Sequence, residues 1–189
     1  MSFNIFKKVV TEVLQLSVNG NITYPDLSKQ TTAYRGYAGQ FSSLVDQTTA
    51  SGTALNVVAL ATTDYSDGVS VVSNKVTYAN AGTYAFEFDA QVENINTTTR
   101  QDVYFFLRKN GTDVVGSTTS ASVVIQASSI TGKTLVGTSH IVTVAAGDYL
   151  ELIWAGTSTD VSLKYTAASA TGIIRPSTAS ISVATWLLK

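Results

Sequence analysis

Acidic side chains come nearest to a catalytic pattern in this sequence. Glu87, Asp89 and Glu93 lie close together in one segment. A glycosidase needs two carboxylates that face one cleft at a separation of about 5 to 10 Å. Alternation along a strand instead places Glu87 opposite the aromatic side chains of its own segment, where it is solvated or paired with an arginine. We therefore expect no catalytic pair among these carboxylates.

A second acidic group consists of Asp64 and Asp67, the latter followed by Gly68. Carboxylate oxygens suit Ca²⁺, which takes six to eight hard ligands. Two side chains are too few for that number, and an aspartate followed by glycine also favours a plain turn. For a single chain, a weak cation site and a turn both stay open.

Nucleophiles and general bases are scarce. His140 is the only histidine, there is no cysteine, and no serine lies in a Gly-x-Ser-x-Gly pattern. A chain without cysteine has no thiol nucleophile and no thiolate metal ligand. Alternation puts His140 on the face of Val142 and Val144, which predicts a packed side chain rather than a base. The sequence therefore predicts a protein that is not an enzyme.

The composition is typical of an all-β protein of low charge. Charged residues make up 13% of the 189 residues, against about 25% in an average domain. With a net charge of −1, nothing electrostatic favours nucleic acid or an anionic membrane as a partner. The apolar runs are also shorter than the roughly 20 residues that span a bilayer. Without cysteines or a secretory signal pattern, we expect assembly in the cytoplasm without export.

Residues 1–36 differ from the rest and are predicted to form an N-terminal arm. Asn19-Gly20 predicts a hairpin turn within it, and residues 28–32 predict a polar linker. Apolar side chains near its start recur at three- and four-residue steps, which favours a short amphipathic helix, although a strand also fits. Such an arm either attaches the chain to a larger assembly or packs on its own head, and we favour attachment. The candidate attachment residues are Phe3, Phe6, Val10 and Leu14.

Residues 37–189 are predicted to form a single all-β head, because turn signals recur along them as in a sandwich or barrel. The clearest turns are Asp67-Gly68, Asn80-Ala81-Gly82, Asn110-Gly111, Gly132-Lys133 and Gly147-Asp148. The strands expected between them are 75–78, 84–92, 103–107, 123–125, 139–144, 149–154 and 181–188.

The segment after Gly82 alternates most clearly. Tyr84, Phe86 and Phe88 fall on one face, and Glu87 falls on the other. A wide aromatic face is more than a half-exposed strand needs. We therefore expect a second sheet or a neighbouring subunit to cover it.

Three segments carry a family resemblance. They are Gly82-x-Tyr84-x-Phe86, then Gly147-Asp148-Tyr149-Leu150-Glu151-Leu152, and the final stretch from Ile181 to Leu188. In order and spacing they resemble the globular head of complement C1q and its tumour-necrosis-factor relatives, although Val76 stands where that family usually has phenylalanine. The resemblance implies a jelly-roll β-sandwich that forms a homotrimer about a threefold axis.

The resemblance also implies which parts of the chain meet at that axis. The middle strands of the family supply the subunit contact, and aromatic side chains are enriched in such interfaces. Some trimeric relatives hold calcium near the axis, so copies of Asp64 and Asp67 from three chains could complete a Ca²⁺ site. The candidate interface residues are Tyr84, Phe86, Phe88, Tyr104 and Phe106.

Two segments resemble bacteriophage versions of this head: Phe106-Leu107-Arg108-Lys109-Asn110-Gly111-Thr112 and Ala145-Ala146-Gly147-Asp148-Tyr149. That resemblance implies a virion protein that decorates or cements the capsid, with the arm bound to other virion proteins such as the major capsid protein. The alternative is a trimeric fibre tip or adhesin that recognises a host glycan or protein. Its ligand would meet exposed apical residues such as Asp64, Tyr65 and Asp160.

Overall fold

The computed structural model describes residues 15–16, 22–23, 29–30 and 36–189. The chain divides into two compact units, Met1–Arg35 and Gly36–Lys189. All regular structure among the described residues is β, so this part of the chain offers no helix that could cross a membrane. The prediction of an all-β protein is confirmed for these residues.

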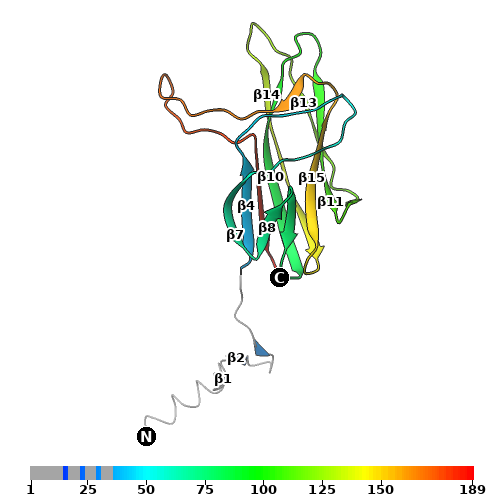
Figure 1. Ribbon diagram of the computed structural model, residues 1–189, viewed down its shortest axis with the longest axis vertical. Coiled ribbons are helices and arrows are strands. Elements are labelled where there is room, and N and C mark those ends of the chain that lie inside the picture. Colours follow the sequence, from blue (N-terminus) through cyan, green and yellow to red (C-terminus); the bar gives the residue numbers. More distant parts are fainter. Residues whose placement is uncertain (1–14, 17–21, 24–28, 31–35) are drawn as a thin grey trace. The chain divides into compact units, whose positions relative to one another are not determined.

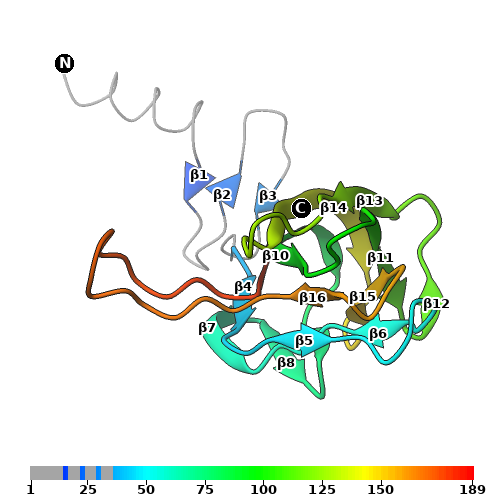
Figure 2. The same ribbon diagram turned by 90° about the horizontal axis from the view of Figure 1, so that it is seen from above.

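Unit 2 consists of two antiparallel seven-stranded sheets (Figures 1 and 2). The first sheet contains β4 (Ala38–Ser43), β5 (Gln47–Thr48), β7 (Thr62–Asp67), β10 (Gly82–Asn94), β14 (Gly132–Val144), β16 (Val161–Leu163) and β17 (Ile181–Leu187). The second contains β6 (Asn56–Val57), β8 (Val69–Val72), β9 (Lys75–Tyr78), β11 (Gln101–Lys109), β12 (Thr112–Asp113), β13 (Thr119–Val123) and β15 (Tyr149–Gly156).

The chain alternates between the two sheets as it proceeds. In the first sheet the long strands lie in the order β7, β4, β17, β10, β14. In the second the order is β8, β9, β15, β11, β13. Both orders bring strands that are distant in sequence side by side, with β4 pairing the last strand, β17.

The core lies between the sheets and is built from inward-facing residues of alternate strand positions. The side chains of Tyr84, Phe86 and Phe88 in β10 are at most 1% exposed, whereas Glu87 between them is exposed. Phe88 packs on Phe105 of β11 in the second sheet, with ring centroids 4.9 Å apart. The alternation in this segment is therefore confirmed, and the second sheet is what covers its aromatic face.

Two of the predicted turns fall where expected. Asn110-Gly111 reverses the chain between β11 and β12, with φ of 49° and 81°. Both residues of a type I′ turn need positive φ, which asparagine and glycine tolerate best. Gly147 likewise has a φ of 86° in the turn between β14 and β15.

Other local predictions were wrong. Gly132-Lys133 begins β14 instead of forming a turn, and a Cβ at position 132 would collide with the carbonyl of Val124. The turn predicted at Asn80-Ala81-Gly82 does join β9 to β10, but its last residue, Gly82, already belongs to β10, where a Cβ would collide with the Leu187 side chain. The strand expected at 123–125 instead runs from Thr119 to Val123, because Val123 pairs with Gln101, the first residue of β11.

Unit 1 contains three short paired strands among its described residues: β1 (Gln15–Leu16), β2 (Ile22–Thr23) and β3 (Lys29–Gln30). Antiparallel pairing of β1 with β2 agrees with a hairpin between them. Pairing of β2 with Lys29–Gln30 shows a strand where a linker was predicted. The predicted helix lies outside the described residues.

One hydrogen-bond relay joins the two sheets inside the core. The Tyr78 hydroxyl, in β9, lies 3.1 Å from the Thr185 hydroxyl, in β17, and Thr185 Oγ1 donates to the Ala85 carbonyl at 2.7 Å. Burial of the Tyr78 phenol raises its pKa, although the hydrogen bond with Thr185 opposes this shift. Because both side chains are buried, each hydroxyl depends on the other rather than on water.

A double-mutant cycle tests this relay. We expect Tyr78→Phe to lower the free energy of unfolding by about 0.5–1.5 kcal/mol, because one net hydrogen bond is lost. Thr185→Val should cost more, about 1–3 kcal/mol, since it leaves the Tyr78 hydroxyl buried without a partner. Urea denaturation of both variants and of the double variant measures the coupling. Purely additive losses would show that the two hydroxyls do not act together.

Candidate functional site

The structure separates the five aromatic residues predicted to form a subunit interface. Tyr84, Phe86 and Phe88 are enclosed within the core of the chain itself. Tyr104 and Phe106 lie on the outer face of the second sheet, where Tyr104 is 38% exposed and Phe106 is half-buried. No single surface presents the five side chains together.

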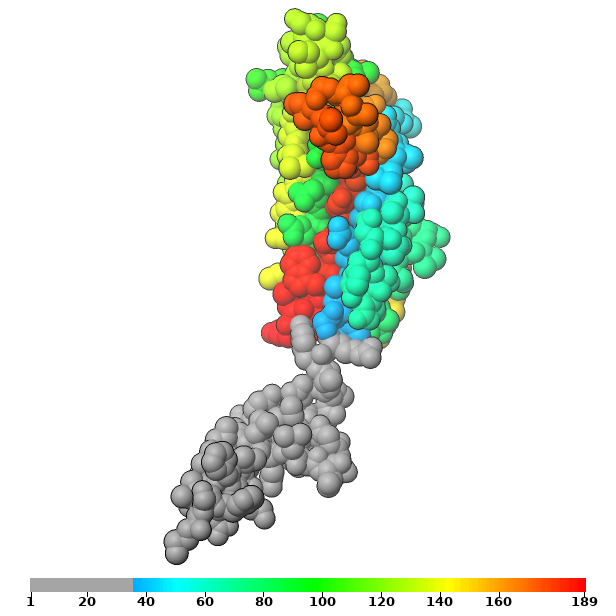
Figure 3. Space-filling model, turned by 90° about the vertical axis from the view of Figure 1, so that its left-hand side faces the viewer, coloured from blue at the N-terminus to red at the C-terminus, as the bar shows by residue number. Residues whose placement is uncertain are grey.

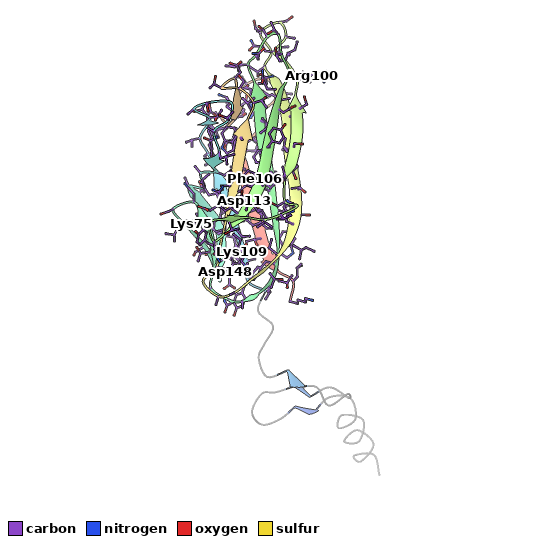
Figure 4. The ribbon with its side chains drawn as sticks, turned by 90° about the vertical axis from the view of Figure 1, so that its right-hand side faces the viewer. Lys75, Arg100, Phe106, Lys109, Asp113 and Asp148 are labelled. Atoms are coloured by element: carbon purple, nitrogen blue, oxygen red, sulfur yellow. The ribbon has the colours of Figure 1, made fainter. Side chains whose placement is uncertain are left out.

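The outer face of the second sheet carries paired charges (Figure 4). Arg108 Nε contacts Asp113 Oδ1 at 2.8 Å. At the end of the sandwich, Lys109 Nζ contacts Asp148 Oδ2 at 2.9 Å and donates to the Thr143 carbonyl of β14 at 2.8 Å. The Lys75 ammonium lies 4.3 Å from the centre of the Tyr149 ring. Charges satisfied in this way are typical of a surface that faces water.

Three donors converge on Asp148 at the turn between β14 and β15. The backbone N–H of Ala145 donates to it at 2.8 Å, the Asn110 amide donates at 2.7 Å, and the Lys109 ammonium is adjacent. Together they hold the pKa of this carboxyl at about 2, below its usual value of 3.8. The carboxylate thus joins the β14–β15 turn to the Asn110-Gly111 turn.

The outer face of the first sheet differs, because exposed apolar side chains form a row across its strands. Figure 3 views this face, with β14, β10, β17, β4 and β7 side by side. In the register, Ala85 of β10 stands between Ile141 of β14 and Trp186 of β17. Ile141 is 73% exposed and Trp186 is 38% exposed, while Ala85 beneath them is buried. Leu135, 61% exposed, lies further along the same face of β14.

An open hollow of about 190 Å³ lies beside this apolar row. Glu87 and Asp89 line it from β10, and the short side chains of Ser182 and Ala184 line it from β17. Gln40 of β4 also lines it. Across β10 from the hollow, a Cβ at Gly137 of β14 would collide with the Asp89 side chain. Neither carboxylate takes part in the four ion pairs formed by the described residues. The hollow is therefore an acidic depression within an otherwise low-charge face.

The remaining candidate residues do not converge on a reactive centre. His140 shares a row with Phe86 on the inner face, where burial lowers its pKa and Nε2 has no hydrogen-bond partner among the described residues. Asp64 and Asp67 lie in the edge strand β7. Across residues 36–189, no three acidic or histidine side chains gather as a metal site would require. A calcium site shared by three chains stays a prediction.

The apical residues of the adhesin alternative also lie apart. Tyr65 is 52% exposed in β7 and stands level with Gln40 of β4. Asp160 accepts hydrogen bonds from Asn96 at 2.7 Å and from Ser158 at 3.1 Å, so it stabilises its own turn. The attachment residues Phe3, Phe6, Val10 and Leu14 fall outside the described residues and stay predictions.

Comparison with known proteins adds no relative: no family model and no curated protein matches the sequence. The argument for function therefore rests on the chain's own surfaces.

The apolar row was missed at the sequence level because its residues come from strands distant in sequence. One signal was present. In β14, buried Val136, Val142 and Val144 alternate with outward Leu135 and Ile141. A strand that is apolar on both faces is typical of burial on both faces. Outward apolar residues in β14, together with Trp186 in the last strand, therefore indicate an apolar outer face on the first sheet.

Asp148 provides a pH-dependent prediction. Because the folded pKa of about 2 lies below the usual 3.8, its stabilising effect is complete above the usual value and is lost as the pH falls through about 2. We expect Asp148→Asn to lower the melting temperature by a few degrees at pH 7, with the difference shrinking below pH 4. Thermal denaturation across this range measures it. A difference unchanged from pH 7 to 2 would contradict the assignment.

Proposed function

We propose that this chain is a non-enzymatic structural protein of a bacteriophage particle, whose head forms a homotrimer. The outer face of the first sheet is the subunit contact, and residues 1–36 attach each subunit to the virion through proteins such as the major capsid protein. The observation that carries the assembly proposal is the exposed apolar row Ile141, Ala85 and Trp186 on that face.

The pairing of the long strands supports a jelly roll. Eight strands follow one another in the order β4, β9, β10, β11, β13, β14, β15, β17. The pairs are nested: β4 pairs with β17, β9 with β15, β10 with β14, and β11 with β13. A long hairpin rolled into two sheets has this pattern, and double-sheet jelly rolls recur in viral capsid proteins. The resemblance to C1q-like phage heads agrees with it.

The contrast between the two outer faces supports the choice of interface. On the outer face of the second sheet, Arg108 forms an ion pair with Asp113, and the Lys75 ammonium lies over the Tyr149 ring. On the first sheet, Ile141 and Trp186 expose large apolar surfaces, which in a symmetric oligomer would pack against the neighbouring subunits. A low-charge exterior stabilised by such contacts needs no disulfide, in keeping with a sequence that has no cysteine.

The native mass tests the trimer. The 20.0 kDa chain should give a species of about 60 kDa by light scattering. Ile141→Lys should give a folded monomer, because it places an ammonium group inside the contact. The matched control is Ile130→Lys, since Ile130 is also 73% exposed but lies in the loop before β14. A monomeric wild-type protein, or a trimer indifferent to Ile141→Lys, would overturn this interface.

Co-sedimentation tests attachment. Full-length protein and residues 37–189 are each mixed with capsids of the encoding phage that lack the protein. We expect the full chain to pellet with the capsids and the shorter chain to stay in the supernatant, because the arm supplies the contact. Equal binding of both forms would place attachment on the head, and binding of neither would argue against capsid decoration.

A further inference from the structure

The segment between β16 and β17 departs from the sandwich as a long two-stranded hairpin (Figures 1 and 3). Thr166 and Thr178 exchange backbone hydrogen bonds of 3.0 and 2.7 Å, and Ser169 and Arg175 exchange bonds of 2.9 and 3.2 Å. The hairpin therefore has its own internal pairing. In Figure 3 it rises toward the viewer from the outer face of the first sheet.

The tip of this hairpin is apolar and exposed. Ile173 and Ile174 are 84% and 79% exposed, and they follow Gly172, whose φ is 67°. Two adjacent isoleucines held away from the body in water are unfavourable, because their apolar side chains stay exposed to solvent. An exposed apolar tip on an ordered hairpin indicates a contact that one chain alone cannot make.

The only charged side chain of the hairpin between Thr166 and Thr178 is Arg175. Its Nη1 atom donates to the carbonyls of Ala167 at 3.0 Å and Pro176 at 3.4 Å. Its other two nitrogen atoms form no hydrogen bond with the described residues. The outer face of the first sheet offers the opposite charge, because Glu87 and Asp89 line its hollow without an ion-pair partner.

The base of the hairpin, at Lys164 and Ser180, is hydrogen-bonded to β10 at Gln91. Lys164 N donates to the Gln91 carbonyl at 2.7 Å, and Gln91 N donates to the Ser180 carbonyl at 2.9 Å. Gln91 is the register partner of Leu135 in β14. In a cyclic trimer whose axis runs along the strands, equivalent levels of the subunits coincide. The hairpin of one copy therefore meets a neighbour at the height of its Leu135.

The length of the hairpin suits this contact. The six steps from Thr166 to Gly172 extend about 20 Å at about 3.3 Å per residue of extended chain. Neighbouring strands lie about 4.8 Å apart, so this length crosses about four strands of an adjacent sheet. This length is sufficient to bring Ile174 onto the neighbour's β14 near Leu135. Arg175 would then lie near the next outward-facing pair of that ladder, in which Asp89 stands opposite Gly137.

We propose that the hairpin between Lys164 and Ser180 is an exchange arm that docks on a second copy of this chain. Ile173 and Ile174 pack on the neighbour's Leu135, and Arg175 neutralises the carboxylates of the neighbour's hollow. The arm rests on the trimer proposed above. It adds a second contact between neighbouring copies, in which opposite charges favour the correct partner. A trimer has three arms and three hollows, so each hollow receives one arm.

Cross-linking of the full chain tests this arm without background, because the sequence has no cysteine. Ile174→Cys combined with Leu135→Cys is treated with a short bismaleimide and run on a denaturing gel. We expect a covalent trimer of about 60 kDa, three times 20.0 kDa. The control pairs Ile174→Cys with Val115→Cys, since Val115 is 99% exposed just after β12 in the second sheet, and should not form covalent trimers.

The same samples separate the two proposals. If light scattering finds no trimer, the proposed assembly fails and the arm fails with it. If the protein is a trimer but the 174–135 pair cross-links no better than the 174–115 control, the arm is overturned and the sheet contact stands.

Exchanging the two charges tests the proposed pairing of Arg175 with the neighbour's Asp89. Arg175→Asp and Asp89→Arg should each raise the concentration for half-dissociation of the trimer about tenfold, as expected for loss of a desolvated charge pair. The double variant should recover most of this loss, because it restores opposite charges. A double variant as weak as the sum of both changes would contradict the pairing of Arg175 with Asp89.

Discussion

The alternation of β10 is the constraint on which the other features depend. This strand of thirteen residues pairs with β14 along one edge and with β17 and β16 along the other. Its aromatic residues all point toward the second sheet, and one of them, Phe88, stacks on Phe105. Once they are committed to the core, Ala85, Glu87 and Asp89 must point outward. One choice of register thus fixes both the core and the chemistry of the opposite surface.

That outward surface has two components that suit different contacts. Ile141 and Trp186 flank Ala85 and favour packing, whereas Glu87 and Asp89 line a hollow made by short neighbouring side chains. Closing an apolar contact over unpaired carboxylates would be costly unless a cation enters with it. In the proposed trimer, the hairpin of a neighbouring copy brings Arg175 to these carboxylates as that cation. The proposed sheet contact and the proposed arm would therefore complement each other.

The sequence predicted the elements that depend on local patterns. Alternation identified Tyr84, Phe86 and Phe88 as one face, and Asn110-Gly111 identified a turn, because both signals lie within a few residues. It did not predict that β14 begins at Gly132. The constraint there is close contact with the Val124 backbone, and a local turn pattern does not reveal such a contact. Aromatic content alone also selected Tyr84, Phe86 and Phe88 for a subunit contact, whereas the structure buries them in the chain's own core. Which residues share an outer face is set by cross-strand register, which local sequence does not reveal.

Oxidative footprinting of the native protein tests the central claim most directly. Trp186 and Tyr104 are each 38% exposed in a single chain, but they lie on the outer faces of different sheets. With each rate normalised to the intrinsic reactivity of its side chain, the account predicts that Trp186 is strongly protected in the assembled protein and that Tyr104 reacts as its exposure implies. Equal normalised rates at the two residues would show that the outer face of the first sheet is open to water, and would contradict the account.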